Sequence, residues 1–255
     1  METHNSQEIR LEKEDNKIEK HPKQDFQVER LAFFSDAVFA IAITLLVVEF
    51  KIPHITADTT YDDALKQLWD LKYLFIATLF SFLLIASYWR NHHLLFKYIH
   101  NYNDKLIYIN MLVLLPIIFF PFTTSFFAES YNSLLVENGK SLNIFFLGFR
   151  LFMINHFFIS LMCYILYWYA MVKHKELSFT MPMKEKMRFR TDILFVVFTF
   201  FVAIILSFLN LSFINNMFIL DFVLWGGIII WVIIKRKQKK RFAEEDKLKY
   251  PEKRE

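Results

Sequence analysis

Glycine and cysteine are scarce in this chain, and several familiar motifs are missing. Four glycines and one cysteine, Cys163, occur in 255 residues. A lone cysteine within an apolar segment excludes a disulfide framework or a cysteine metal site inside one subunit, and it indicates a packing role. The sequence also lacks a Walker loop, a His-Glu-x-x-His zinc site, a Gly-x-Ser-x-Gly nucleophile elbow and a Thr-Val-Gly-Tyr-Gly filter. The sequence therefore predicts neither an enzyme nor an ATP-driven pump, and no cofactor is expected.

Long apolar segments dominate what is present. Hydrophobic residues make up 55% of the chain, and they gather in runs long enough to cross about 30 Å of hydrocarbon at about 1.5 Å per residue. The sequence predicts an all-α integral membrane protein with six transmembrane helices. The expected spans are Leu31–Phe50, Leu71–Trp89, Leu106–Phe127, Asn143–Met171, Ile193–Leu209 and Met217–Ile234.

Positive charge alternates between the connecting segments. Lys and Arg number six in residues 1–30, three in 90–105, six in 173–190 and ten after Ile234, while the intervening loops hold few. Because cytoplasmic loops carry the excess of Lys and Arg, both termini are expected in the cytosol, and no secretory signal is expected. We predict a charged N-terminal segment (1–29), a membrane domain (30–234) and a basic tail (235–255) that contacts anionic lipid rather than nucleic acid.

An acid lies inside the first span. If the helix began at Ser35 or Asp36, the remainder up to Glu49 would be too short to cross the bilayer, so the helix is expected to begin near Arg30. Asp36 then lies more than one turn inside, where a carboxylate needs a partner or a watery cavity. Arg30 is on a different face, so we expect His92 or Asn110 to donate to Asp36 from neighbouring helices.

A second face of this helix carries an apolar stripe. Ile41, Thr44, Leu45 and Val48 follow the spacing i, i+3, i+4 and i+7, which places them on one side of a helix. Periodicity alone leaves open whether the stripe faces lipid, another helix or a pore.

Further polar residues occur in later spans. Arg150, Asn155 and His156 in the fourth span can reach the interface, bond across helices or line a crevice. Pro116 and Pro121 are expected to kink the third helix, with nearby hydroxyls meeting the carbonyls that proline leaves unpaired.

Several of these residues together resemble a known family. Arg30-x-x-x-Phe34-Ser35-Asp36 is similar to the first-helix motif of the prokaryotic relatives of the animal endolysosomal potassium channel. The resemblance continues at Trp89-x-x-His92-x-x-Leu95-Phe96, at Asn110 and at Phe120-Pro121-Phe122. The hydropathy pattern agrees over all six spans, whereas the specific motifs cover only the first half of the chain.

The resemblance implies a function and an assembly. It implies a homotetrameric, potassium-selective channel in a prokaryotic plasma membrane, with K+ as permeant ion and a central pore lined by the first helix. The hydrophobic constriction then falls on Ile41, a pore-lining hydroxyl on Thr44, and further apolar levels on Leu45 and Val48. Arg30, Phe34, Ser35, Asp36, Trp89, His92 and Asn110 are expected to form a structural network rather than an ion site.

Two other functions stay open at this point. A cation or proton-coupled transporter would use Asp36 and His156 as exchanging groups during alternating access. A membrane enzyme or assembly factor would act at His92 and His93, although a nucleophile, base and orienting group are missing from the sequence.

Overall fold

The computed structural model describes residues 22–50, 55–136 and 142–208, with five single positions between 233 and 240. Over this part the protein is all-helical, and its one strand-like feature is an isolated bridge between Ile99 and Ser178. The elements are α2 (Pro22–Val48), α3 (Tyr61–Asp70), α4 (Lys72–Phe96), α5 (Asp104–Ile118), α6 (Phe120–Val136), α7 (Leu142–Tyr167), a π-helix η1 (Trp168–Lys173), a 3-10 turn η2 (Lys175–Leu177) and α8 (Met183–Phe208).

Five of the six predicted spans fall on described helices. Segments Phe26–Val48, Lys72–Phe96, Asp104–Leu135, Leu142–Lys173 and Glu185–Phe208 are each long and apolar enough to cross a membrane. The sixth, Met217–Ile234, lies almost entirely outside the described residues. The first helix begins at Pro22, inside the segment predicted to be a separate N-terminal region.

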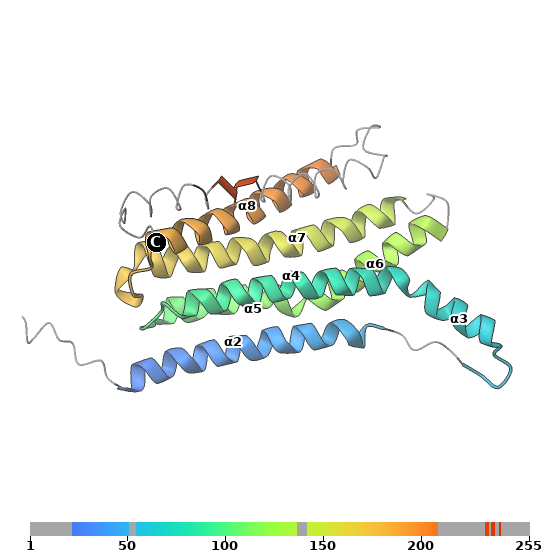
Figure 1. The fold of residues 1–255 in the computed structure, drawn as a ribbon, viewed down its shortest axis with the longest axis horizontal. Coiled ribbons are helices and arrows are strands. Elements are labelled where there is room, and N and C mark those ends of the chain that lie inside the picture. The colour runs from blue at the N-terminus through green and yellow to red at the C-terminus, as the bar shows by residue number, and fades with distance from the viewer. Residues whose placement is uncertain are drawn as a thin grey trace, which may run out of the picture.

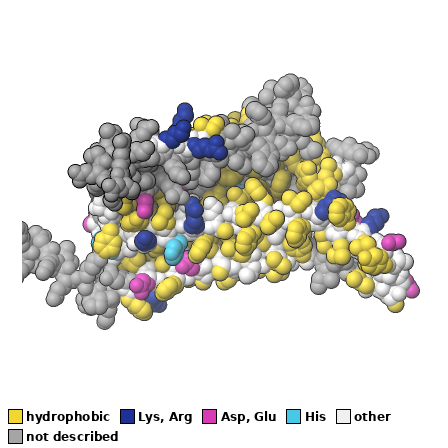
Figure 2. Space-filling model, viewed as in Figure 1, with side chains coloured by type: hydrophobic (Ala, Val, Ile, Leu, Met, Phe, Trp, Pro, Cys, Tyr) yellow, Lys and Arg dark blue, Asp and Glu magenta, His cyan; other side chains and the backbone are white. Residues whose placement is uncertain are grey.

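The helices form layers, in which α7 lies between α8 on one side and α4, α5 and α6 on the other (Figure 1). α2 lies along one edge against α4, α5 and α6, while α8 lies along the opposite edge against α7. Buried side chains are densest on α7. Hydrophobic side chains cover much of the visible face of the bundle (Figure 2), as expected for helices whose outer surfaces meet lipid.

The third span is broken at its prolines. α5 ends at Ile118, Phe119 forms a turn and α6 begins at Phe120. Pro116 lies inside α5, whereas Pro121, the second residue of α6, has no N–H to donate to the carbonyl of Ile117, so the helical hydrogen bonding is interrupted at Phe119. The hydroxyl of Thr123 donates to the carbonyl of Phe120 at 3.0 Å. The predicted disruption of the third span is therefore confirmed, whereas the Thr123 hydroxyl meets the carbonyl of Phe120 and not one that Pro116 or Pro121 leaves unpaired.

α6 and α7 approach closely at Gly148. A Cβ atom built on Gly148 would meet the hydroxyl of Ser130 and lie only 2.9 Å from the Ser130 Cβ. The absence of a side chain at Gly148 therefore permits this helix contact, as small residues do in other membrane helix pairs.

Two connecting segments pair at the end of the bundle that the charge pattern predicts to be cytoplasmic. The amide of His100 donates to the carbonyl of Leu177 at 3.0 Å, and the amide of Phe179 donates to the carbonyl of Tyr98 at 2.8 Å. The Tyr98 hydroxyl donates to Glu185 at 2.5 Å, which raises the pKa of the phenol. These contacts tie the α4–α5 connection to the α7–α8 connection.

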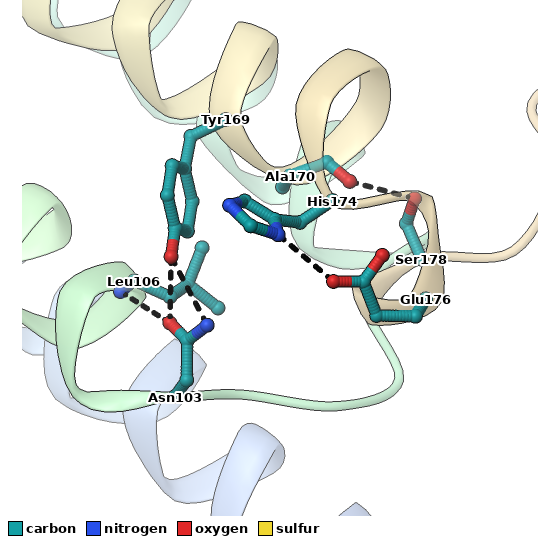
Figure 3. A network of polar contacts seen from close by, with 7 residues as sticks. All are labelled: Asn103, Leu106, Tyr169, Ala170, His174, Glu176 and Ser178. Carbon is teal, nitrogen blue, oxygen red and sulfur yellow. Dashed lines mark hydrogen bonds and ion pairs between the residues drawn. The ribbon is translucent and has the colours of Figure 1, made fainter.

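A side-chain network supports the same end (Figure 3). Asn103 caps α5 by accepting from the amide of Leu106 at 2.9 Å, and its amide donates to the Tyr169 hydroxyl at 3.0 Å. Across the loop, His174 Nδ1 lies 2.8 Å from Glu176 Oε1. A backbone hydrogen bond, and then the contact with His174, lowers the pKa of Glu176. The π-helical turn brings Tyr169 and His174 together, with ring centroids 4.6 Å apart.

Candidate functional site

α2 has one buried face and one exposed face. Ser35, Phe39, Ala42 and Leu46 are buried against the neighbouring helices, and their spacing of four, three and four residues keeps them on one side. The predicted stripe lies on another side: Ile41 is 57% exposed and Val48 is 72% exposed, while Thr44 and Leu45 are also exposed. No part of the chain that the structure describes covers this stripe, so it can meet lipid, another copy of the chain or a water-filled space.

The hydroxyl of Thr44 is oriented by its own helix. Its Oγ1 donates to the carbonyl of Ile41 at 2.8 Å. Because the hydroxyl hydrogen is used in this bond, the oxygen lone pairs remain available on the exposed face. A threonine held in this way can offer an oxygen ligand to a cation.

A chain of buried polar groups fixes the opposite face. The Asn110 amide nitrogen donates to Ser35 Oγ at 2.9 Å, and His92 Nε2 lies 2.8 Å from Asn110 Oδ1. Ser35 passes its own hydrogen to the carbonyl of Leu31 at 2.9 Å. The ring of His92 packs against Phe39 and stacks on Phe96, with centroid distances of 5.5 and 4.5 Å.

The directions of these bonds are mutually consistent. Asn110 donates through its nitrogen, so its oxygen accepts, and His92 must carry a proton on Nε2. Each of the three side chains therefore finds a partner in a region where an unpaired polar group is costly. These three side chains link α2, α4 and α5, and they fix how α2 is rotated about its own axis.

Asp36 has a different donor from the one predicted. The indole nitrogen of Trp89 donates to Asp36 Oδ1 at 2.9 Å, and His93 Nδ1 lies 4.0 Å from Oδ2. The expectation that His92 or Asn110 donates to Asp36 was wrong, because Asn110 donates instead to Ser35, one residue earlier, and His92 bonds to Asn110. Trp89 and His93, one turn apart on α4, are the residues that reach Asp36.

The surroundings of Asp36 are partly open. The carboxylate is one of the groups around a cavity of about 460 Å³ bounded by α2, the end of α4 and Phe179. This agrees with the expectation that Asp36 needs a partner or a watery space. Arg30 lies on the exposed surface and donates to Gln27 at 3.5 Å, while Phe34 is exposed. Of the seven motif residues, the described contacts therefore bring together Ser35, Asn110 and His92 in one group and Asp36 with Trp89 in another.

The polar residues of the fourth span bond across helices. Arg150 Nη2 donates to the carbonyl of Ser207 at 2.6 Å, with its guanidinium 4.3 Å from the Phe208 ring centroid. His156 Nδ1 lies 3.1 Å from the Tyr88 hydroxyl, and the Asn155 amide donates to Thr123 at 3.4 Å. Sequence alone left these roles open, and the structure assigns them to packing between helices.

Two further predictions concern metal and cysteine chemistry. Among the residues that the structure describes, no group of three or more His, Cys, Asp or Glu side chains is arranged to hold a metal ion. Cys163 is buried and free, in keeping with a packing role.

Comparison with known families supports the resemblance found in the sequence. Residues 30–121 match the family described as endosomal/lysosomal potassium channel TMEM175. This range contains the first-helix motif and also Trp89, His92 and Asn110, so the predicted resemblance is confirmed over residues 30–121, which carry most of the specific motifs.

Curated relatives match about two fifths of the chain. A potassium channel of Streptomyces collinus is 38% identical over 100 residues, covering 39% of this chain and 47% of the relative. A potassium channel of Chamaesiphon minutus is 40% identical over 110 residues, covering 42% and 52%. A third, from a Chryseobacterium species, is 32% identical over 102 residues, covering 40% and 50%. The chain spans about half the length of these relatives.

Solved structures share the fold over a longer range. The crystal structure of a lysosomal potassium-selective channel TMEM175 homolog from Chamaesiphon minutus superimposes with a TM-score of 0.60 at 24% identity, covering 83% of this chain and 98% of that one. A variant of the potassium channel MtTMEM175, in complex with a nanobody fusion protein, gives 0.58 at 21% identity, covering 83% and 93%. At these identities the structures show a common all-helical fold.

Proposed function

We propose that this chain is one subunit of a homotetrameric, potassium-selective cation channel, in which K+ moves down its gradient through a central pore lined by α2. The proposal places the protein in a prokaryotic plasma membrane. The observation that carries it is the arrangement of α2, whose inner face is fixed by buried packing and polar bonds while Ile41, Thr44, Leu45 and Val48 are uncovered. The matched relatives are named as potassium channels, and none of those reported above is an enzyme.

Four copies of α2 around one axis would direct the four stripes toward one another. Rings of Ile41, Leu45 and Val48 would then form apolar levels, with Ile41 as the narrowest. An apolar ring too narrow for a hydrated ion opposes conduction by excluding water, without any charge. Opening requires this ring to widen.

Selectivity follows from the cost of removing water. K+ is larger than Na+ and holds its hydration shell less tightly, so a partly dehydrating constriction favours K+. The Thr44 hydroxyl, which already donates to the carbonyl of Ile41, can direct lone pairs toward the ion and replace part of the lost water.

The buried hydrogen bonds that link Ser35, Asn110 and His92 serve this function indirectly. If α2 rotated by one residue, the stripe would turn by about 100° and a different set of side chains would meet the axis. The buried bonds oppose such a rotation. The motif is therefore a positioning device for the pore helix.

The coupled-carrier alternative gains little from the described residues. Asp36 bonds to Trp89 beside a cavity, whereas His156 is fully buried and packs against the rings of Phe152 and Phe200. No contact within the described part of the chain links the two groups. A carrier that exchanges protons between them would need a route that this arrangement does not provide.

The proposed function is tested with purified protein in planar lipid bilayers under asymmetric K+ and Na+. We expect steady currents that reverse close to the K+ equilibrium potential, with protein-free bilayers as the control. A reversal potential that moves with an imposed pH gradient would instead identify a proton-coupled carrier. Absence of current from protein that remains tetrameric by size analysis would contradict the channel.

A further inference from the structure

The short helix α3 is formed locally, and the one described element that packs against it appreciably is α4, which follows it directly. Its N-terminus is a capping box: Thr60 Oγ1 accepts from the amide of Asp63 at 3.2 Å, and Asp63 accepts from the amide of Thr60 at 3.4 Å. A helix of ten residues is marginal in water without tertiary support. α3 buries none of its residues, so the described part of the chain supplies little of the surface that would stabilise it.

The two faces of α3 differ sharply in chemistry. Tyr61, Leu65, Leu68 and Trp69 follow i, i+4, i+7 and i+8 on one face, and each is between 46% and 77% exposed. The opposite face carries the charged side chains Asp62, Asp63, Lys66 and Asp70. Such a helix, with a strongly charged face and an aromatic and aliphatic face, is the kind that lies in a membrane interface.

The apolar face of α3 is continuous with the outer surface of a membrane span. Only Leu71 separates α3 from α4, and the Lys72 ammonium lies 5.5 Å from the Trp69 ring centroid and 4.7 Å from that of Tyr73. Phe75 and Ile76 then continue the exposed apolar surface along α4. Trp, Tyr and Lys at the end of a span are typical of the level of the lipid headgroups. This continuity favours lipid over a second protein as the occupant, and Figure 1 shows α3 at the end of the bundle beyond α4.

We propose that α3 is a membrane-interface helix, which binds the phospholipid surface with Leu65, Leu68 and Trp69 directed toward the acyl chains. Its acidic face is directed toward water, and Lys72 reaches the phosphates. The inference concerns a lipid-binding surface outside α2 and does not depend on ion conduction.

Site-directed spin labelling tests this surface. Leu68→Cys and the matched control Lys66→Cys, on opposite faces of α3, are each labelled with a nitroxide in vesicles of phosphatidylcholine and phosphatidylglycerol. Wild-type protein, whose Cys163 is buried, gives the labelling blank. The ratio of collisions with oxygen, which concentrates in lipid, to collisions with a water-soluble nickel chelate reports the environment of the label.

We expect the oxygen-to-nickel ratio to be several-fold higher at Leu68→Cys than at Lys66→Cys. Equal nickel access at both positions would place α3 in water and overturn the proposal. Shielding of the Leu68→Cys label from both reagents would also overturn it, in favour of a contact with another copy of the chain. Leu65→Cys, one turn away on the same face, repeats the measurement if Leu68→Cys fails to fold. Because no current is measured, failure here leaves the channel function separately testable.

Discussion

The indole of Trp89 donates a hydrogen bond of 2.9 Å to Asp36, 53 positions earlier in the sequence, and so joins α4 to α2. This bond supplies the partner that a carboxylate inside a membrane span requires. It also separates the roles of two adjacent residues, because Ser35 bonds to Asn110 while Asp36 bonds to Trp89. The Phe-Ser-Asp motif therefore anchors α2 at two points on neighbouring faces.

Replacing Trp89 with Phe tests the second anchor. Phe keeps an aromatic ring but loses the donor, so we expect a loss of about 1 kcal/mol in stability. This is below the usual value for a bond to a charged group because Asp36 is partly exposed. The measurement is the thermal midpoint of the tetramer in detergent. Trp168→Phe, with a similar exposed fraction, is the control and should change the midpoint less. Asp36→Asn is expected to harm assembly or gating, and an intact tetramer with altered ion selectivity alone would contradict the structural role.

Replacing Asn110 with Ala tests the first anchor. The change leaves His92 Nε2 without a buried partner and removes the donor to Ser35 Oγ, which keeps its bond to the carbonyl of Leu31, so we expect a cost of about 2 to 3 kcal/mol. Asn155→Ala is the matched control, because that buried amide makes a longer bond, 3.4 Å to Thr123. Thermal unfolding followed by size analysis compares the two variants. Equal destabilisation would show that the polar chain has no special role in holding α2.

Gly148→Ala tests the close approach of α6 and α7. The new methyl group would overlap Ser130, and its Cβ would lie 2.9 Å from that of Ser130, so we expect a destabilisation of about 1 to 3 kcal/mol. Adding Ser130→Gly should restore most of the loss by making room for the methyl group. If the double variant is no more stable than Gly148→Ala alone, the contact between these two residues is not what limits the packing.

The sequence predicted features set by neighbouring residues better than contacts between residues far apart in the sequence. The apolar runs predicted five described spans, because crossing the hydrocarbon requires a fixed helix length, and proline chemistry predicted the break near Phe119. The partner of Asp36 was missed because an acid within a membrane span indicates that a donor is needed but not which residue supplies it. The rotation of α4 decides whether Trp89, His92 or His93 reaches Asp36. That rotation cannot be read from the spacing until the buried face of α4 is known.

The length of α2 was also underestimated. Polar residues before Arg30 suggested a separate segment, yet the helix begins at Pro22. Charged residues are compatible with a helix that continues beyond the membrane, so hydropathy marks the end of a span and not the end of its helix. The stripe of Ile41, Thr44, Leu45 and Val48 was visible as a periodicity, but its pore role stays a prediction.

Thr44→Val tests the contribution of the hydroxyl to selectivity. The substitution keeps the shape and removes the oxygen, so we expect the K+ to Na+ permeability ratio to fall several-fold because dehydration is no longer partly compensated. Thr44→Ser keeps the hydroxyl and should retain most of the selectivity. Reversal potentials in asymmetric K+ and Na+ give the ratio. An unchanged ratio in Thr44→Val would assign selectivity to the apolar rings alone.

The most direct test of the account is thiol modification at Ile41 during K+ conduction in planar bilayers. With a charged methanethiosulfonate reagent, Ile41→Cys channels should lose most of their current. Val47→Cys, which is on α2 and similarly exposed but about 120° away around the helix, should keep it. Full modification of Ile41→Cys, confirmed by mass, with an unchanged K+ current would contradict the proposal that this residue lines the ion's narrowest passage.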